Sequence, residues 1–242
     1  MTRKNDSMSA SVPESPSPSK SAAVSAEARE ERLDVGATVT GLSHAQWSGG
    51  TGRPPTAVIH HGADPGRFTF TPAHNGYLCY LGRFIPGKGP LHAIAAAREL
   101  GMPIVLAGPE TPYYREAVAP HVDWREVRWI GPVDAQERNA LLGGAAALLY
   151  PLTEPEPFGL VQIEAMLCAT PVAATSIGAV PEIVEPGVSG CLAGTPDALA
   201  GAVRDALRLD RACVRAAAEA RFSARRMAQA YVKVAESLRT RV

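Results

Sequence analysis

From Tyr77 onward, short apolar runs alternate with helix-forming stretches, and most of the runs end at glycine or proline. Strands that alternate with helices in this way predict an α/β fold, a Rossmann-like parallel sheet with helices on both faces. The predicted strands are Tyr77–Leu81, Pro103–Ala107, Val127–Ile130, Ala146–Tyr150, Pro171–Ala174 and Cys191–Leu192. The predicted helices are Leu91–Leu100, Tyr113–Val118, Asp134–Leu142, Gly159–Leu167, Pro181–Val184, Asp197–Leu207, Ala212–Arg221 and Ala224–Leu238. Ligands of such sheets bind beyond the carboxyl ends of the strands, so we expect a site at the glycine-containing turns.

The chain before Tyr77 has a different composition. Residues 7–25 hold eight serines and three prolines, which cannot bury enough apolar surface to offset the entropy of ordering, and residues 1–35 are predicted to be a disordered tail. Between this tail and Tyr77, Val35–Leu42 and Ala57–His60 are short strand candidates, separated by a loop at Ser48–Pro55.

Charge and cysteine content restrict the partners and the location. The 24 lysines and arginines balance the 24 aspartates and glutamates, which argues against a nucleic-acid partner. The longest weakly polar run, Leu141–Leu152, is too short for a membrane span, and the polar start Met1–Asp6 predicts no secretory signal. The cysteines form no CxxC pair. Together these features predict free thiols in a cytoplasmic protein.

Two cations lie in the turn after the first regular strand. The segment Gly82–Gly89 fits the start of a phosphate-binding P-loop, GxxxxGK, but Gly89 stands where that motif needs serine or threonine to hold magnesium. A nucleoside triphosphatase is therefore not expected. Arg83 and Lys88 lie five residues apart and together can neutralise a diphosphate. The alternative is that both are solvated loop cations.

The segment Glu154–Glu164 is the most informative part of the chain. Pro157 and Gly159 suit a helix entrance, where the free N–H groups of Gly159, Leu160 and Val161 form an anion site. At helical rise, Glu156 and Glu164 are about 12 Å apart, farther than the roughly 5–9.5 Å of paired glycosidase carboxylates. The spacing favours a long ligand with one carboxylate at each end. The alternative is two surface glutamates.

Metal and dinucleotide motifs are missing. The sequence has no DxD and no GxGxxG, and His60 and His61 would point to opposite faces of a strand. No metal and no cofactor are therefore expected.

These motifs together resemble the C-terminal, donor-binding domain of the retaining glycosyltransferases of family 4, which have the GT-B fold. The resemblance runs from about Ala57 to the end and rests on segments that occur in the family's order: Gly82–Gly89, Ala107–Pro109, Ile130–Gly131, Glu156–Glu164 and Gly178–Val184. It implies that residues 36–76 are a remnant of the N-terminal domain and the interdomain linker. Residues 77–242 would then be the nucleotide-sugar domain with its C-terminal crossover helix.

The resemblance also implies the roles of the site residues. Arg83 and Lys88 would hold the donor's diphosphate, helped by the N–H groups of Leu160 and Val161. Glu156 would hold the donor sugar near the reacting carbon, Glu164 the ribose, and the Ile130–Val133 turn the base. The expected catalytic residues are Glu156, Arg83 and Lys88. The expected donor-binding residues are Arg83, Lys88, Gly108, Val133, Phe158, Gly159, Leu160, Val161 and Glu164. A UDP-sugar is the first expectation, without a divalent metal.

The chain departs from the family pattern at its front and at two glycines. Ala169 and Ala179 replace usual glycines and would add methyl groups near the pocket wall. The N-terminal acceptor domain is expected to be missing, which would leave Met227, Tyr231, Val234 and Leu238 of the last helix partly uncovered. The chain is thus predicted to be a retaining glycosyltransferase that is inactive or slow alone. The alternatives are a non-catalytic nucleotide-sugar-binding module that docks on a separate acceptor-domain protein, and an epimerase-like or hydrolytic enzyme.

Overall fold

The computed structural model describes residues 40–48 and 55–239. In this part of the chain, six parallel strands form one sheet in the order β5-β4-β3-β6-β7-β8, which confirms the predicted fold class. The strands are β3 (Tyr77–Leu81), β4 (Ile104–Ala107), β5 (Val127–Trp129), β6 (Ala145–Tyr150), β7 (Val172–Thr175) and β8 (Gly190–Ala193). A separate parallel pair joins β1 (Thr40–Gly41) and β2 (Ala57–Val58). The predicted tail at residues 1–35 lies outside the described residues, as do residues 49–54 of the predicted loop.

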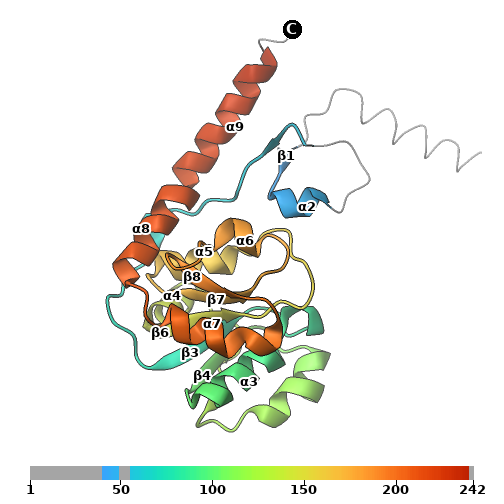
Figure 1. Ribbon diagram of the computed structural model, residues 1–242, viewed down its shortest axis with the longest axis vertical. Helices are drawn as coiled ribbons and strands as arrows, with labels where there is room; N and C mark the ends of the chain where they lie inside the picture. The colour runs from blue at the N-terminus through green and yellow to red at the C-terminus, as the bar shows by residue number, and fades with distance from the viewer. Residues whose placement is uncertain (1–39, 49–54, 240–242) are drawn as a thin grey trace, which may run out of the picture. The chain divides into compact units, whose positions relative to one another are not determined.

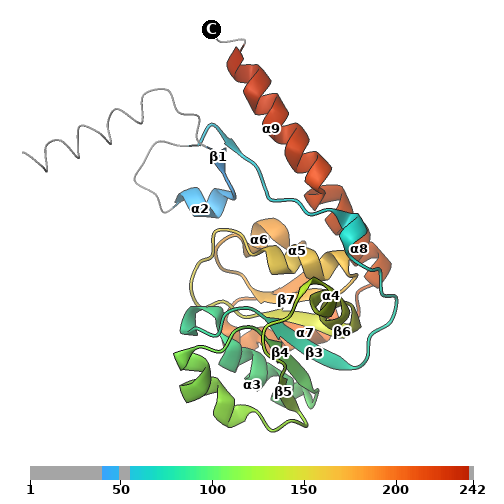
Figure 2. The same cartoon turned by 180° about the vertical axis from the view of Figure 1, so that it is seen from behind.

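Helices cover both faces of the six-stranded sheet (Figures 1 and 2). Neighbouring strand residues point to opposite faces, so Cys79 and Leu148 pack with one hydrophobic cluster, and Leu78 and Leu149 with the other. The first cluster includes α4 (Ala135–Gly144), α5 (Leu160–Leu167), α6 (Val180–Ile183) and α8 (Arg211–Phe222). The second includes α3 (Pro90–Leu100) and α7 (Leu199–Ala206). The described chain also contains shorter helical elements. They are the helix α2 (His44–Ser48), a π-helical turn at Tyr114–Val118, and 3-10 turns at Pro65–Arg67, Pro86–Lys88, Ala119–His121 and Pro196–Ala198.

Local sequence signals fix where the helices near the strand ends begin. The side chain of Asp134 accepts hydrogen bonds from the N–H groups of Gln136 and Glu137, both at 2.8 Å, and Glu137 accepts one from the N–H of Asp134 at 2.9 Å. This capping box confirms Asp134 as the residue that starts α4. Helix α5 begins at Leu160, because Gly159 has a φ of 94° and precedes the first helical residue.

Ala169 lies in the left-handed region, with a φ of 69°, at the end of α5. The N–H of Ala169 donates to the carbonyl of Met166 and the N–H of Thr170 to that of Ala165, both at 2.9 Å, which is the Schellman arrangement that usually places glycine at this position. Its methyl group is fully buried and does not line the cavity described below, contrary to the expectation that it lies near the pocket wall. Ala179 does not line the cavity either, and its φ of −79° is unstrained.

We expect the variant A169G to be about 1–2 kcal/mol more stable than A179G, because only the first substitution relieves a left-handed alanine. Both methyl groups are fully buried, so the two variants lose similar apolar contacts. Urea unfolding of both variants and the parent chain measures the difference. Equal losses in the two variants would show that the backbone at Ala169 carries no strain.

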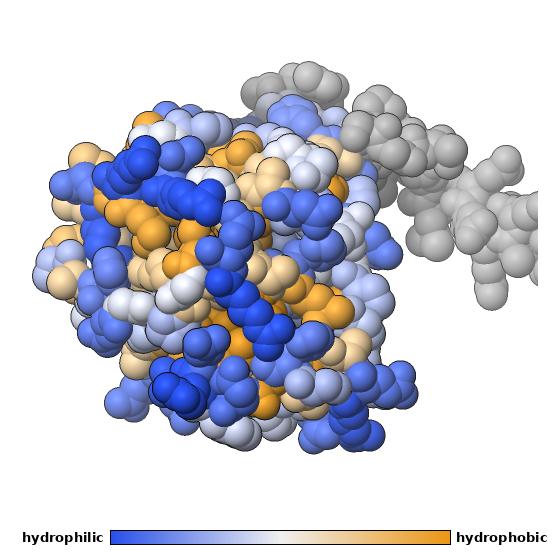
Figure 3. All heavy atoms as spheres, turned by 60° about the horizontal axis from the view of Figure 1, so that its bottom comes forward, coloured by the Kyte–Doolittle hydropathy of each residue, from blue (hydrophilic) through white to orange (hydrophobic). Residues whose placement is uncertain are grey.

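Helix α9 (Ala224–Arg239) contacts the rest of the described chain only near its start. None of its residues is buried, and both views show it extending away from the sheet (Figures 1 and 2). Tyr231 is 40% exposed and Val232 is 55% exposed. The predicted uncovering of Met227, Tyr231, Val234 and Leu238 is therefore confirmed. No helix within the described ranges is long and apolar enough to cross a bilayer. On the face drawn in Figure 3, apolar and strongly hydrophilic side chains are interspersed.

Three arginines of α8 bind backbone carbonyls of segments that are distant in sequence. Arg211 donates at 2.8–2.9 Å to the carbonyls of Thr71, Gly143 and Ala145 and to the hydroxyl of Thr170. Arg215 binds the carbonyls of Pro65, Phe68 and Leu167, and Arg221 those of Glu182 and Ile183. The bonds of Arg211 and Arg215 hold the segment before β3 against the sheet domain, and those of Arg221 join α8 to α6.

Candidate functional site

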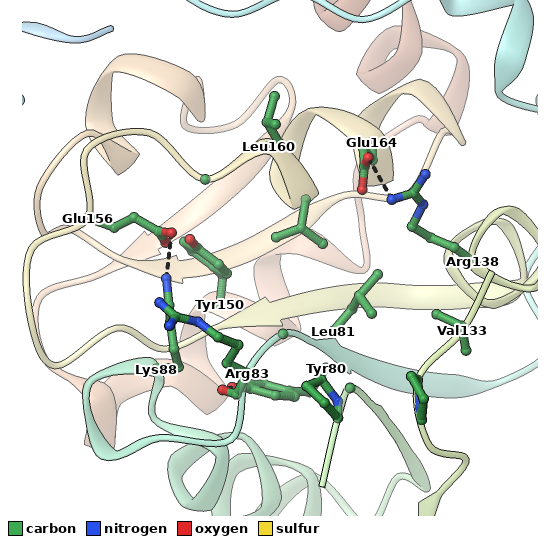
Figure 4. Close-up of a pocket in the computed structure, with 16 residues that line it drawn as sticks. Tyr80, Leu81, Arg83, Lys88, Val133, Arg138, Tyr150, Glu156, Leu160 and Glu164 are labelled. Carbon is green, nitrogen blue, oxygen red and sulfur yellow. Dashed lines mark hydrogen bonds and ion pairs between the residues drawn. The ribbon is translucent and has the colours of Figure 1, made fainter. Parts of the chain in front are cut away.

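The strand order places a crevice at the carboxyl ends of β3 and β6. These strands are neighbours, and the chain continues from β3 to β4 on one side of the sheet and from β6 to β7 on the other. Ligands of open α/β sheets bind at such a switch point. A cavity of about 390 Å³ occupies it. Its lining residues are Tyr80, Leu81, Gly82, Arg83, Lys88, Gly108, Pro109, Pro132, Val133, Arg138, Tyr150, Glu156, Gly159, Leu160, Val161 and Glu164 (Figure 4).

The turn after β3 carries both predicted cations to this cavity. The Tyr80 hydroxyl donates to the carbonyl of Arg83 at 2.8 Å, which fixes the start of the turn. The 3-10 turn Pro86–Lys88 ends at Gly89, whose φ of 63° and close approach to the Pro151 carbonyl leave no room for a side chain. Arg83 and Lys88 therefore lie together at one side of the cavity, as predicted (Figure 4).

Lys88 and Glu156 form a partly buried ion pair. Lys88 Nζ lies 2.5 Å from Glu156 Oε1, and the two side chains are 16% and 25% exposed. The ammonium also lies 5.9 Å from the ring centroid of Tyr150, within cation–π range. Glu156 Oε2 is buried and accepts no hydrogen bond from any described residue. Arg83 is exposed, and none of the ion pairs among the described residues involves it.

The entrance of α5 faces the same cavity. A side chain at Gly159 would meet the Tyr150 hydroxyl at 2.6 Å, so glycine alone fits here. The first residues of the helix, Leu160 and Val161, line the cavity, and their N–H groups belong to the first turn, which has no internal carbonyl partners. Because Glu156 lies before the helix, the distance of about 12 Å predicted from helical rise does not apply to it.

Glu164 pairs with Arg138 at the other end of the cavity. Arg138 Nη1 lies 3.1 Å from Glu164 Oε1, and the glutamate side chain is 16% exposed. Burial raises the pKa of Glu164, and the positive charge of Arg138 opposes that rise. Arg138 Nε is buried without a partner among the described residues. The capping box orients the first turn of α4, and Asn139, which bonds to Thr69 and Arg67, fixes its rotation.

Arg138 is a cavity residue that no motif of the sequence predicts. The position of Arg138 could have indicated it, since Arg138 lies four residues after the predicted helix cap Asp134 and just beyond the turn expected to line the base. Tyr80, Leu81, Pro109 and Tyr150 also line the cavity, and no motif predicts a role for them; they lie there because they end strands or follow them. Pro132 belongs to the Ile130–Val133 turn, which the resemblance places against the base.

The structure places Gly108 and Val133 in the cavity wall, as expected, but places Phe158 elsewhere. Phe158 is 3% exposed and packs between the rings of His60, His61 and Phe222, with centroids 5.7, 5.1 and 6.5 Å away. The two histidines contact the same ring, contrary to the prediction of opposite faces, because β2 ends at Val58 and strand alternation does not extend to them. His60 Nε2 also lies 3.1 Å from Glu182 Oε2.

The cavity therefore has an acid–cation pair at each end, with apolar side chains and a helix entrance between them (Figure 4). Within the described ranges, no group of three or more histidine, cysteine, aspartate or glutamate side chains is arranged to hold a metal ion.

Known proteins share this architecture. The family model "Glycosyl transferases group 1" matches residues 69–222. A glycogen synthase of Mycobacterium tuberculosis is 35% identical over 188 residues, which are 71% of this chain and 44% of that protein. The chain thus spans less than half the length of this relative. Among solved structures, AviGT4, a glycosyltransferase involved in avilamycin A biosynthesis, has a TM-score of 0.73 at 31% identity, covering 82% of this chain and 63% of that one. Anabaena Alr3699/HepE in complex with UDP-glucose has a TM-score of 0.71 at 25% identity, covering 83% and 64%.

Proposed function

The chain belongs to the glycosyl transferases group 1 family, and from this premise we propose that it takes part in sugar transfer from a nucleotide-diphosphate sugar, with retention at the anomeric carbon, as in family 4. The observation that carries the proposal is the pair of acid–cation contacts at the two ends of one cavity. A neutral ligand would need neither cation, whereas a nucleotide sugar has hydroxyl groups at both ends and a diphosphate between them. UDP and a hexose are the proposed donor parts, because HepE binds UDP-glucose.

Arg83, Lys88 and the entrance of α5 are the proposed diphosphate site. Two cations and the free N–H groups of a helix start favour a dianion. Charge develops on the diphosphate as its bond to the sugar breaks, and donors that are already in place stabilise that charge without reorganising. This supports catalytic roles for Arg83 and Lys88, and we propose that no metal ion is needed.

Glu156 is the proposed sugar-binding acid, and it would exchange partners when the donor binds. In the free protein one of its oxygens is occupied by Lys88 and the other is a buried acceptor without a donor. A diphosphate attracts Lys88, so the carboxylate becomes available to hydroxyl groups of the sugar.

Glu164 is the proposed ribose-binding acid, with Pro132 and Val133 against the base. A carboxylate accepts hydrogen bonds from two adjacent hydroxyls, as a ribose offers. The charge of Arg138 favours the ionised form of this carboxylate, and the ion pair fixes its direction, so we assign Arg138 as a positioning residue of the nucleoside end.

A second function, a nucleotide-sugar-binding module that acts with a separate acceptor-domain protein, is favoured by α9, none of whose residues is buried. We place either activity in the cytoplasm, which suits the free thiols of the described chain. Co-purification of a partner through α9 supports the module, and sugar transfer by this chain alone supports the enzyme.

Calorimetric titration of the chain with UDP, GDP and ADP tests the proposed function. We expect saturable binding that is strongest for UDP, since the proposed donor carries it. The double variant R83A/K88A is the control for binding in the cavity and should lose the signal. Failure of all three nucleotides to bind at millimolar concentration would contradict the proposal.

The Arg138 assignment predicts a change in the pH dependence of UDP binding. Ionised Glu164 can accept from both ribose hydroxyls, whereas protonation turns one of its oxygens into a donor and weakens this contact. The pKa of Glu164 is already raised by burial. Removing the opposing cation in R138M raises the pKa of Glu164 further. As the pH is lowered, UDP affinity should therefore begin to fall at a higher pH in R138M than in the parent chain. Affinity measured from neutral to mildly acidic pH checks this, with R125M, an exposed arginine outside the cavity, as control. Identical pH profiles for R138M and R125M would rule out the assignment.

A further inference from the structure

A second cavity, of about 170 Å³, adjoins the first. It lies between the turn after β3 and the loop after β6, and its lining residues are Arg83, Ile85, Gly87, Lys88, Leu152, Glu154, Pro155, Glu156 and Pro157. Arg83, Lys88 and Glu156 line both cavities. The Lys88–Glu156 ion pair is therefore part of the wall between them.

The order of groups along the first cavity indicates what would reach the second one. Glu164 and Arg138 lie at one end of the first cavity, and Lys88 and Glu156 at the other (Figure 4). With the ribose at Glu164 and the diphosphate at Lys88, the sugar attached to the diphosphate lies at Glu156. The second cavity continues from that residue, on the side away from the nucleoside.

Glu154 carries a carboxylate that is exposed and adjoins this second cavity. No hydrogen bond or ion pair is recorded for its side chain within residues 40–48 and 55–239. Gly87 leaves it space: a side chain at Gly87 would lie 2.6 Å from Glu154 Oε2. The neighbouring residue Thr153 joins the two loops, since its N–H donates to the Gly87 carbonyl at 3.1 Å and its hydroxyl to the Pro86 carbonyl at 3.2 Å. Pro155 and Pro157 restrict the backbone conformations of the segment that follows Glu154.

The charges of this cavity favour an uncharged ligand. In the free protein Arg83 and Lys88 balance the carboxylates of Glu154 and Glu156, so a divalent cation would meet a guanidinium and an ammonium, and an anion would meet two carboxylates. When the diphosphate of a bound donor attracts Arg83 and Lys88, the carboxylates of Glu154 and Glu156 are left facing this cavity, and a polyhydroxylated ring suits them because its hydroxyls donate to both.

We propose that the second cavity receives the far hydroxyl groups of the donor hexose and that Glu154 is a specificity-determining residue for that sugar. This inference rests on the proposed function, because it needs the nucleotide in the first cavity. Glu154 accepts hydrogen bonds from two adjacent hydroxyls, and a sugar lacking them would leave the carboxylate without its donors.

The test compares the affinities of UDP and UDP-glucose for the parent chain and for E154A, E154Q and G87A. The affinity for UDP-glucose divided by the affinity for UDP isolates the hexose contribution. We expect E154A to lower this ratio about tenfold, the size of one lost charge-assisted hydrogen bond. E154Q keeps one acceptor oxygen and should lose less. G87A leaves all charges in place but displaces the carboxylate, so it should lower the same ratio. E116Q, an exposed glutamate outside both cavities, is the control.

Three results overturn the inference in distinguishable ways. If the parent chain binds no UDP, the proposed function fails and this inference fails with it. If it binds UDP but UDP-glucose no more tightly, this inference and the sugar-binding role of Glu156 fail, while the proposed nucleotide site stands. If the ratio in E154A and G87A equals that in E116Q, the hexose binds without Glu154.

Discussion

UDP is expected to bind about 10- to 100-fold more weakly when Lys88 is replaced by alanine. A charge-assisted hydrogen bond contributes about 1.5–3 kcal/mol, and K88A removes the cation nearest the proposed sugar end of the diphosphate. The variant also leaves the Glu156 carboxylate facing the phosphates without its counter-ion, and this like-charge contact adds to the loss. Calorimetry with UDP measures the effect.

Two variants control for the K88A result. R83A removes a cation that is exposed and outside the ion pairs of the described chain, so it should weaken UDP binding less than K88A does. K233A removes an exposed lysine of α9, outside the donor cavity, and should leave UDP binding unchanged. UDP binding by K88A as tight as by K233A would mean that the diphosphate does not occupy this end of the cavity.

The largest loss of stability is expected from R211A, about 3 kcal/mol in the free energy of unfolding. The guanidinium of Arg211 is half-buried and donates to three backbone carbonyls and the Thr170 hydroxyl. Burial lowers the pKa of Arg211, because it disfavours the charged form, while these contacts supply partners for its N–H groups. Removing it leaves buried acceptors without donors, the type of change that costs most in point variants.

The control for R211A is R208A, three residues earlier. Arg208 is 78% exposed, and its one ion pair within the described residues is with Asp205, at 3.3 Å, so its removal should change stability by less than 1 kcal/mol. Urea unfolding compares the two variants under the same conditions. A similar small loss in both would show that the carbonyl network contributes little to stability.

The sequence predicted the strands well because strand and helix signals are local. Every predicted strand from Tyr77 onward is present within about two residues, since each is a short, mainly apolar run and most are followed by a glycine or proline. The order of the strands depends on pairings such as Leu78 with Ala147, which join residues far apart in the chain, and no local pattern specifies them.

The same distinction separates the predicted site residues from the missed ones. Arg83, Lys88, Glu156 and Glu164 were predictable, because turns and a helix entrance mark where they lie. Arg138 was not, since its direction depends on bonds of Asn139 to residues about 70 positions earlier in the sequence. The resemblance places Phe158 in the donor site, but distant partners, His60, His61 and Phe222, hold its ring away.

The arginines of α8 bind main-chain oxygens, which every amino acid supplies. The residues that present those oxygens, Pro65, Phe68 and Thr71 among them, can therefore be exchanged during evolution without loss of an acceptor, while the arginines themselves cannot. Homologous chains are thus expected to vary freely in the segment before β3 and to keep guanidinium groups on the helix that holds it.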